Sequence, residues 1–76
     1  MTIHVRFFAS LRDQTGIDSK TVDVDGLLTV RELWCALTDE PLDETTLVAL
    51  NKVYAGPDHT IKDGDEVAFF PPITGG

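Results

Sequence analysis

Apolar and polar positions alternate along residues 3–8, which is typical of a strand with one buried face. One face carries Ile3, Val5 and Phe7, and the other carries His4, Arg6 and Phe8. The alternation returns at residues 21–25, where Val22 and Val24 are expected to point inward. The polar stretch at residues 12–16 between them is expected to be a turn or loop. The pattern therefore predicts a hairpin whose connection is longer than a tight turn.

A helical period begins after Asp25-Gly26, a pair that ends the second predicted strand. Thr29 and Glu32 have the spacing of a capping box, which marks a helix N-terminus. Four large apolar residues then fall on one helical face: Val30, Leu33, Trp34 and Leu37. The helix is expected to end around residues 38–39. Because so short a helix is marginal on its own, we expect it to pack against a sheet.

The second half of the chain predicts a loop and further short strands. Residues 39–46 are polar and acidic, which indicates a loop. The apolar run 47–50 predicts a strand covered on both faces or near the sheet centre, although periodicity alone leaves a helix open. Residues 66–70 predict the last strand, which Pro71 ends. The predicted fold class is α+β, with one main helix across one face of the sheet and the other face partly exposed.

Composition limits the classes of partner. The chain has 76 residues, enough for one domain, and 42% of them are hydrophobic, enough for a compact core. Its 13 acidic and 6 basic residues give a net charge of −7, which argues against binding to nucleic acid or anionic membranes. The charge fits docking to a basic protein surface, although solubility alone would also explain it. With a single cysteine, and no segment typical of a signal peptide or a membrane span, we expect a cytoplasmic protein.

Side chains that could catalyse or bind metal are scattered along the sequence. His4 and His59 are interpreted as surface or turn residues, and Cys35 as a small packing residue beside the apolar stripe of the helix. The sequence has no glycine-rich phosphate loop, no nucleophile elbow and no calcium-loop spacing around Asp63 and Asp65. We therefore expect no metal site and no active site built from side chains.

The C-terminus is the best candidate for chemistry. Gly75 and Gly76 lack a Cβ, so they fit a narrow slot and leave an acyl group at Gly76 open to attack. Pro71 and Pro72 favour an extended path without internal hydrogen bonds. A stiff base and a flexible tip suit insertion into the active site of a partner. The alternative is an inert end, because chain ends are commonly loose.

Two aromatic side chains are predicted on the exposed face of the sheet. The alternation in the first and last strands points Phe8 and Phe70 outward, and Tyr54 is a candidate third member. Phe70 directly precedes the tail, which favours a docking patch for a partner. Packing of strand-end aromatics against loops is the alternative.

The C-terminal sequence closely resembles one known family. Residues 63–76, Asp-Gly-Asp-Glu-Val-Ala-Phe-Phe-Pro-Pro-Ile-Thr-Gly-Gly, resemble the end of the small subunits of molybdopterin synthase. Residues 5–9 and 50–59 are similar as well, whereas residues 17–46 match only in pattern. The loop after the helix is shorter than in some members. The resemblance implies a ubiquitin-like β-grasp fold with a mixed sheet, formed by a domain at residues 1–70 and an extended tail at residues 71–76.

The resemblance also implies a sulfur-carrier role. In that family an E1-like enzyme uses ATP to adenylate the terminal glycine, here Gly76, which becomes a thiocarboxylate and donates sulfur to cyclic pyranopterin monophosphate. Gly75 provides a slim approach to it, and the carrier itself binds no cofactor. The implied partner-binding residues are Phe8, Tyr54, Phe70, Pro71 and Pro72, of which Tyr54 stands where some members have an aliphatic residue. The implied assembly is a heterotetramer with a dimer of the large synthase subunit, and the isolated chain is expected to be monomeric.

Three other functions remain open from the sequence. A sulfur carrier for thiamine or cysteine synthesis would keep the fold and the terminal glycines, although the Phe-Phe-Pro-Pro segment at residues 69–72 favours the molybdopterin assignment. A ubiquitin-like protein modifier would use the same adenylation to join Gly76 to lysines. An interaction module would leave the tail inert.

Overall fold

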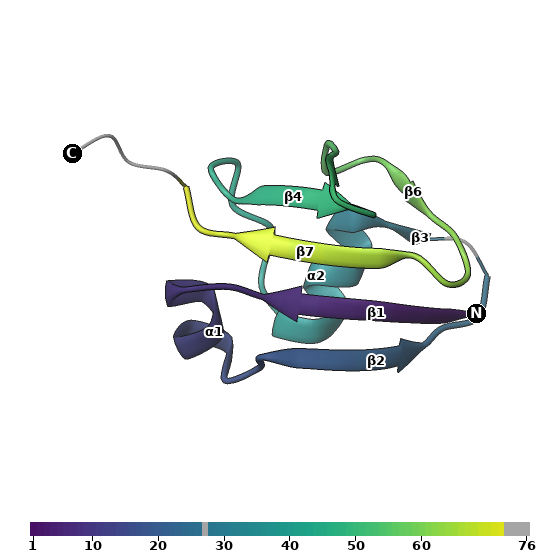
Figure 1. The fold of residues 1–76 in the computed structure, drawn as a ribbon, viewed down its shortest axis with the longest axis horizontal. Coiled ribbons are helices and arrows are strands. Elements are labelled where there is room, and N and C mark those ends of the chain that lie inside the picture. The colour runs from purple at the N-terminus through teal and green to yellow at the C-terminus, as the bar shows by residue number, and fades with distance from the viewer. Residues whose placement is uncertain (27, 73–76) are drawn as a thin grey trace.

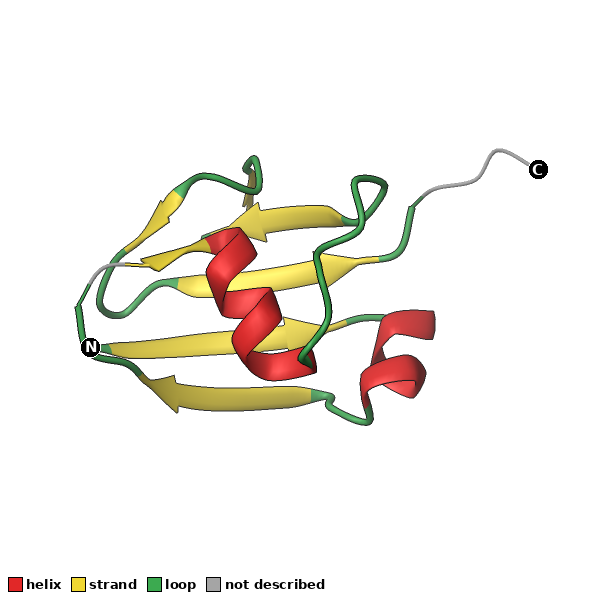
Figure 2. Cartoon of the chain, turned by 180° about the vertical axis from the view of Figure 1, so that it is seen from behind, coloured by secondary structure: helices red, strands yellow, loops and turns green. Residues whose placement is uncertain are grey.

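A five-stranded mixed sheet forms the body of the molecule, and α2 crosses one of its faces (Figure 1, Figure 2). The computed structural model describes residues 1–26 and 28–72. Its elements are β1 (Thr2–Phe7), α1 (Ser10–Thr15), β2 (Ser19–Asp23), β3 (Leu28–Thr29), α2 (Val30–Thr38), β4 (Leu47–Leu50), β5 (Val53–Tyr54), β6 (Thr60–Ile61) and β7 (Glu66–Phe70). The main sheet has the order β2-β1-β7-β4-β5, and β3 and β6 form a separate pair. The α+β class predicted from the sequence is confirmed.

The first and last strands lie side by side at the centre of the sheet (Figure 1). β1 pairs with β2 antiparallel, as the predicted hairpin requires, and with β7 in parallel. The parallel register runs from His4 opposite Glu66 to Phe7 opposite Phe69. The N–H of Phe8 continues this ladder by donating to the carbonyl of Phe69 at 3.1 Å. The end of β1 is thereby fixed beside the point where the chain leaves β7.

The core lies between the sheet and α2. Its buried cluster consists of Ile3, Val5, Phe7, Leu11, Val30, Leu33, Trp34, Leu42, Val48, Ile61, Val67 and Phe69. Trp34 meets the ring of Phe69 edge-on at 5.0 Å between centroids, and the ring of Phe7 at 5.8 Å. The predicted apolar face of the helix is confirmed, because Val30, Leu33 and Trp34 are buried and Leu37 packs against the same cluster.

The N-terminus of α2 carries the predicted capping box. The N–H of Glu32 donates to Thr29 Oγ1 at 3.2 Å, and the N–H of Thr29 donates to Glu32 Oε1 at 2.9 Å. Each bond satisfies a backbone donor that the helix itself leaves unpaired. At the other end Asp39 adopts a left-handed conformation with φ 60°, and its N–H donates to the carbonyl of Cys35. The helix therefore ends where the sequence predicted. Among the described residues, no helix combines the length and apolarity needed to cross a bilayer.

The loop predicted at residues 12–16 is wrong, because this segment belongs mostly to α1. The helix has six residues and buries one side chain, Leu11, so its sequence shows no repeated apolar spacing that would predict a helix. The N–H groups of Leu11 and Arg12 donate to the carbonyls of Phe8 and Ala9, so the helix starts from the end of β1. Gly16 ends it with φ 74°, a conformation that glycine adopts without strain.

The observed strand pairing corrects one further prediction and adds one pair of strands. The second strand covers Ser19–Asp23 rather than residues 21–25, because its bounds follow the register with β1, where Ser19 lies opposite Arg6 and Asp23 opposite Thr2. The β3–β6 pair was not predicted. Each of its strands has two residues, too few to show alternation, and the partners are far apart in the sequence.

Hydrogen bonds between two turns fix the turn that joins β4 and β5 against the start of β7. Asn51 and Lys52 form a two-residue hairpin turn with φ of 51° and 72°. Asn51 Nδ2 donates to Asp65 Oδ1 at 2.9 Å, and Asn51 Oδ1 accepts the N–H of Glu66 at 3.0 Å. Asp65 Oδ2 accepts the N–H of Lys62 at 2.7 Å. Residues from two separate turns are thereby held together.

We expect Asp65→Asn to destabilise the protein by about 1 kcal/mol near neutral pH, since it weakens the bonds to Asn51 and Lys62. Both bonds lower the pKa of Asp65 below its ordinary value of 3.8, and the bond from the Asn51 side chain has the larger effect. A lowered folded-state pKa adds stability above the unfolded value, and that stability is lost as the pH falls through the folded value. Urea unfolding should therefore show the difference between wild type and Asp65→Asn shrinking below about pH 4. A difference that is unchanged in acid would contradict this role, and Asp25→Asn, exposed and outside these turns, is the charge-matched control.

Candidate functional site: the open face of the sheet and the base of the tail

The face of the main sheet opposite α2 carries a shallow apolar pocket, here called the open-face pocket. Its lining residues are Arg6, Phe8, Ala49, Lys52, Tyr54, Glu66, Ala68 and Phe70, and its volume is about 350 Å³. They come from β1, β4, β5 and β7 and from the residues that adjoin these strands. The sequence prediction that one face of the sheet stays partly exposed is confirmed. The pocket ends at Phe70, the last residue of β7 before Pro71.

Phe8 and Phe70 stack on each other at the end of the pocket nearest the tail. Their ring centroids are 4.7 Å apart, and the ring planes differ by 9°. The register explains the contact, because Phe7 lies opposite Phe69 and the next residue of each strand points to the other face. Both rings are half-buried. The predicted outward direction of both side chains is confirmed.

Tyr54 brings a third aromatic ring to the pocket. Its position is set by β5, where Tyr54 lies opposite Ala49 of β4. Tyr54 is 72% exposed, whereas Ala49 and the neighbouring Ala68 are buried in the sheet. Small side chains in the middle and aromatic ones at the edges give the pocket its depth. The structure thus places Tyr54 on the same face as Phe8 and Phe70, as the sequence proposed.

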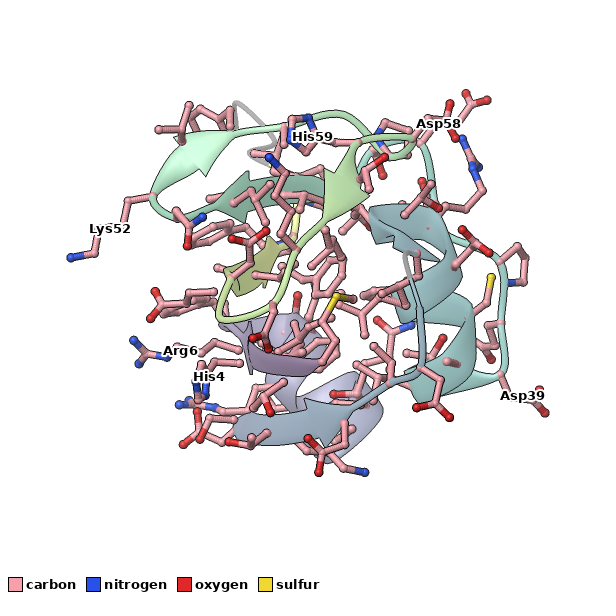
Figure 3. All side chains as sticks on the ribbon, turned by 90° about the vertical axis from the view of Figure 1, so that its right-hand side faces the viewer. His4, Arg6, Asp39, Lys52, Asp58 and His59 are labelled. Carbon is pink, nitrogen blue, oxygen red and sulfur yellow. The ribbon has the colours of Figure 1, made fainter. Side chains whose placement is uncertain are left out.

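Two cations of this face were not identified from the sequence as site residues. The guanidinium of Arg6 lies over the ring of Phe8 at 4.9 Å from its centroid. Lys52 reaches the pocket from the turn before β5. Figure 3 shows Arg6 and Lys52 projecting on the side of the sheet away from α2. The alternation in β1 placed Arg6 on the same face as Phe8, although it was not assigned to the site, and no sequence pattern places Lys52 there.

The base of the tail lies against α1 and the loop after α2. Pro71 is half-buried and Pro72 is exposed. Both line a hollow of about 290 Å³, whose other walls include Leu11 and Gln14 of α1, Trp34, and five residues of the loop after α2: Glu40, Pro41, Asp43, Thr45 and Thr46. Gly75 and Gly76, together with residues 73 and 74 of the predicted extended tail, lie outside the described residues. The predicted chemistry of Gly76 therefore stays a prediction.

The other candidate side chains do not line the open-face pocket. His4 and His59 are exposed, as predicted. Cys35 is also exposed, so its interpretation as a packing residue is wrong. It follows Trp34 by one position, which turns its side chain about 100° away around the helix. Within residues 1–26 and 28–72, no group of three or more histidine, cysteine or acidic residues could hold a metal ion.

Comparison with known proteins agrees with the fold and the tail sequence. The model of the ThiS family matches residues 5–76. The molybdopterin synthase sulfur carrier subunit of Escherichia coli (strain K12) is 40% identical over 80 residues, covering 97% of this chain and 99% of that protein. The same subunit of Chlamydomonas reinhardtii is 39% identical over 83 residues and the full length of both. SAMP1 from Haloferax volcanii, a small archaeal modifier protein, superimposes with a TM-score of 0.80 at 28% identity over all of both chains. The predicted ubiquitin-like β-grasp fold is confirmed.

Proposed function

Because the chain belongs to the ThiS family and is homologous to molybdopterin synthase sulfur carrier subunits, we propose that it carries sulfur for molybdopterin synthesis. The cargo is carried on the carboxyl group of Gly76. The observation that supports this most strongly is the continuity between the open-face pocket and the tail: the Phe8–Phe70 stack is followed directly by Pro71. In a partner bound to this face, the tail would therefore enter beside the surface that contacts Phe8 and Phe70.

The chemistry requires activation before sulfur can be attached. A carboxylate is a poor acyl donor, so an E1-like enzyme transfers AMP from ATP to Gly76 and releases pyrophosphate. A sulfur nucleophile then displaces AMP and leaves a thiocarboxylate. In the synthase each loaded carrier passes one sulfur to cyclic pyranopterin monophosphate, so two such transfers build the dithiolene, and water supplies the oxygen that returns each Gly76 to a carboxylate. Docking makes the transfer effectively intramolecular, which lowers its barrier.

The partners of this reaction are two proteins. The relatives are named as subunits of a synthase, so the stable partner proposed for this chain is the large subunit, which holds the pterin substrate. The E1-like enzyme is the transient partner. We assign Phe8, Tyr54 and Phe70 to the docking surface, and Pro71 and Pro72 to directing the tail away from it. The acid and base groups for sulfur transfer belong to the large subunit.

A reconstituted synthase tests the proposal. The chain is first incubated with the E1-like enzyme, ATP and a sulfur source, and then with the large subunit and cyclic pyranopterin monophosphate. We expect a dithiolene-bearing pterin that forms only when all components are present. A chain that carries a thiocarboxylate but gives no such product with a competent large subunit would assign the sulfur to another pathway.

A second candidate function is modification of other proteins. It is favoured by the similarity to the small archaeal modifier protein from Haloferax volcanii. The same adenylated Gly76 would then form an isopeptide bond with a lysine amine. Mass spectrometry of tryptic peptides from the native cells separates the two functions, because only a modifier leaves residues 63–76 of this chain, the segment after Lys62, attached to lysines of other proteins.

Replacement of Phe70 tests the docking surface. We expect Phe70→Ala to weaken binding to the large subunit by about 10-fold or more, because a stacked aromatic anchor is lost from the contact surface. Folding should change less, since Phe70 is half-buried and its backbone bonds in β7 remain. Isothermal titration and thermal unfolding give the two quantities. Val53→Ala is the control, since Val53 is 68% exposed but does not line the pocket; equal affinities for the two variants would remove Phe70 from the interface.

A further inference from the structure

The open-face pocket has the opposite charge to the rest of the molecule. The chain as a whole carries −7, with 13 acidic and 6 basic residues. The pocket, however, is lined by two cations, Arg6 and Lys52, and one carboxylate, Glu66. Figure 3 shows Arg6 and Lys52 on one side of the sheet, and Asp39 and Asp58 on the side of α2. The surface that a partner touches is therefore locally cationic.

Arg6 is held in place by the aromatic stack. Its guanidinium lies 4.9 Å from the centre of the Phe8 ring, and Phe8 in turn lies on Phe70 at 4.7 Å. Stacking on a ring leaves the guanidinium edges free to donate to a carboxylate. The ion pairs of the described part of the chain are Arg12–Asp18 and Arg31–Asp58, and neither includes Arg6. Its charge is therefore available to a partner.

Lys52 is held by its turn rather than by a ring. The backbone of Lys52 has φ 72° in the two-residue turn before β5. The side chain of the preceding Asn51 binds Asp65 and the N–H of Glu66, which anchors the turn to the start of β7. The ammonium group is carried on a flexible stem, but its backbone is fixed at the rim of the pocket. Arg6 and Lys52 thus present two cations around an apolar centre.

We propose that the surface of the large subunit that contacts this face carries carboxylates opposite Arg6 and Lys52, around an apolar centre that accepts Phe8 and Phe70. Arg6 and Lys52 then select the partner and set its orientation. This inference rests on the proposed function and names the chemistry of the partner surface. The net charge of the chain alone predicts a basic partner surface, but at contact distance the charges of the pocket dominate, because charges further away are screened by salt.

Two charge reversals of equal size test the inference. Lys52→Glu and Lys62→Glu change the net charge of the chain by the same amount, but Lys62 does not line the pocket. With the purified large subunit, we expect Lys52→Glu to raise Kd roughly 10-fold and Lys62→Glu to change it by less than about 2-fold. Raising the salt concentration should weaken wild-type binding more than binding of Lys52→Glu. Arg6→Lys keeps the charge but loses the planar guanidinium, so we expect a smaller loss of affinity for the large subunit than with Arg6→Glu.

The outcomes separate this inference from the proposed function. Equal losses for Lys52→Glu and Lys62→Glu, or tighter binding of Lys52→Glu, would overturn the acidic partner surface while wild-type binding still supported the carrier. Absence of wild-type binding, together with absence of sulfur on Gly76 after treatment with the activating enzyme, would instead overturn the carrier itself. Circular dichroism of each variant checks that the fold is intact.

Discussion

Deletion of Gly76 is expected to abolish sulfur loading and to change the free energy of unfolding by less than about 0.5 kcal/mol. The reason for the first effect is chemical: the proposed reaction takes place on the carboxyl group of Gly76, and deletion moves that carboxyl back by one residue in the slot of the activating enzyme. The reason for the second is that the buried cluster uses residues from Ile3 to Phe69, all of them before the tail. Sulfur loading is measured by thiol-selective labelling, and stability by urea unfolding.

Gly75→Ala provides a matched comparison for this deletion. It keeps the terminal glycine and the chain length but adds a Cβ next to the reactive group. We expect slower loading than in the wild type but not complete loss. A chain that ends at Gly75 and still gains sulfur at the wild-type rate would contradict the assignment of Gly76. A large fall in stability on deletion would show that the tail belongs to the core.

Trp34→Ala is expected to lower the free energy of unfolding by about 3–5 kcal/mol, a large share of the about 5–15 kcal/mol typical of a domain. Trp34 is 3% exposed, and its side chain extends from α2 to contact the rings of Phe7 and Phe69 on the sheet. Truncation would leave a cavity where α2 contacts the aromatic rings of the sheet. Urea unfolding followed by circular dichroism measures the loss.

Two neighbouring substitutions make the effect of Trp34 specific. Trp34→Phe keeps an aromatic ring and removes Nε1, which is buried without a hydrogen-bond partner among the described residues, so we expect a smaller loss. Cys35→Ala changes an exposed residue of the same helix, and we expect a change of less than about 0.5 kcal/mol. A loss for Trp34→Ala no larger than that for Cys35→Ala would contradict this account of the core.

Local signals in the sequence predicted the helix and the direction of the site aromatics. The capping box of Thr29 and Glu32 depends on residues three positions apart, so it can be read directly from the chain. The alternation in β1, and the inward parity of Val67 and Phe69 in β7, likewise indicated that Phe8 and Phe70 point away from the core. What the alternation did not give is the contact between them. That contact requires the parallel pairing of the first and last strands, which no local pattern encodes.

The features that sequence reasoning missed are short or depend on distant partners. Helix α1 has one buried residue, Leu11, and β3 and β6 have two residues each, so none of them shows a period. Lys52 reaches the site because its turn is bound to Asp65 in another turn. Cys35 was interpreted as a small packing residue from its position beside the apolar stripe, but the buried residues of the helix are Val30, Leu33 and Trp34, and Cys35 is exposed.

The central claim is that Gly76 carries sulfur, and intact-mass analysis of the chain from its native cells tests it most directly. The account predicts a species in which sulfur replaces one oxygen, which reacts with a thiol-selective reagent and whose fragments place the label on Gly76. The same species should form in vitro with the E1-like enzyme, ATP and a sulfur source. A chain that ends only in a free carboxylate, both in cells and after that treatment, would contradict the claim.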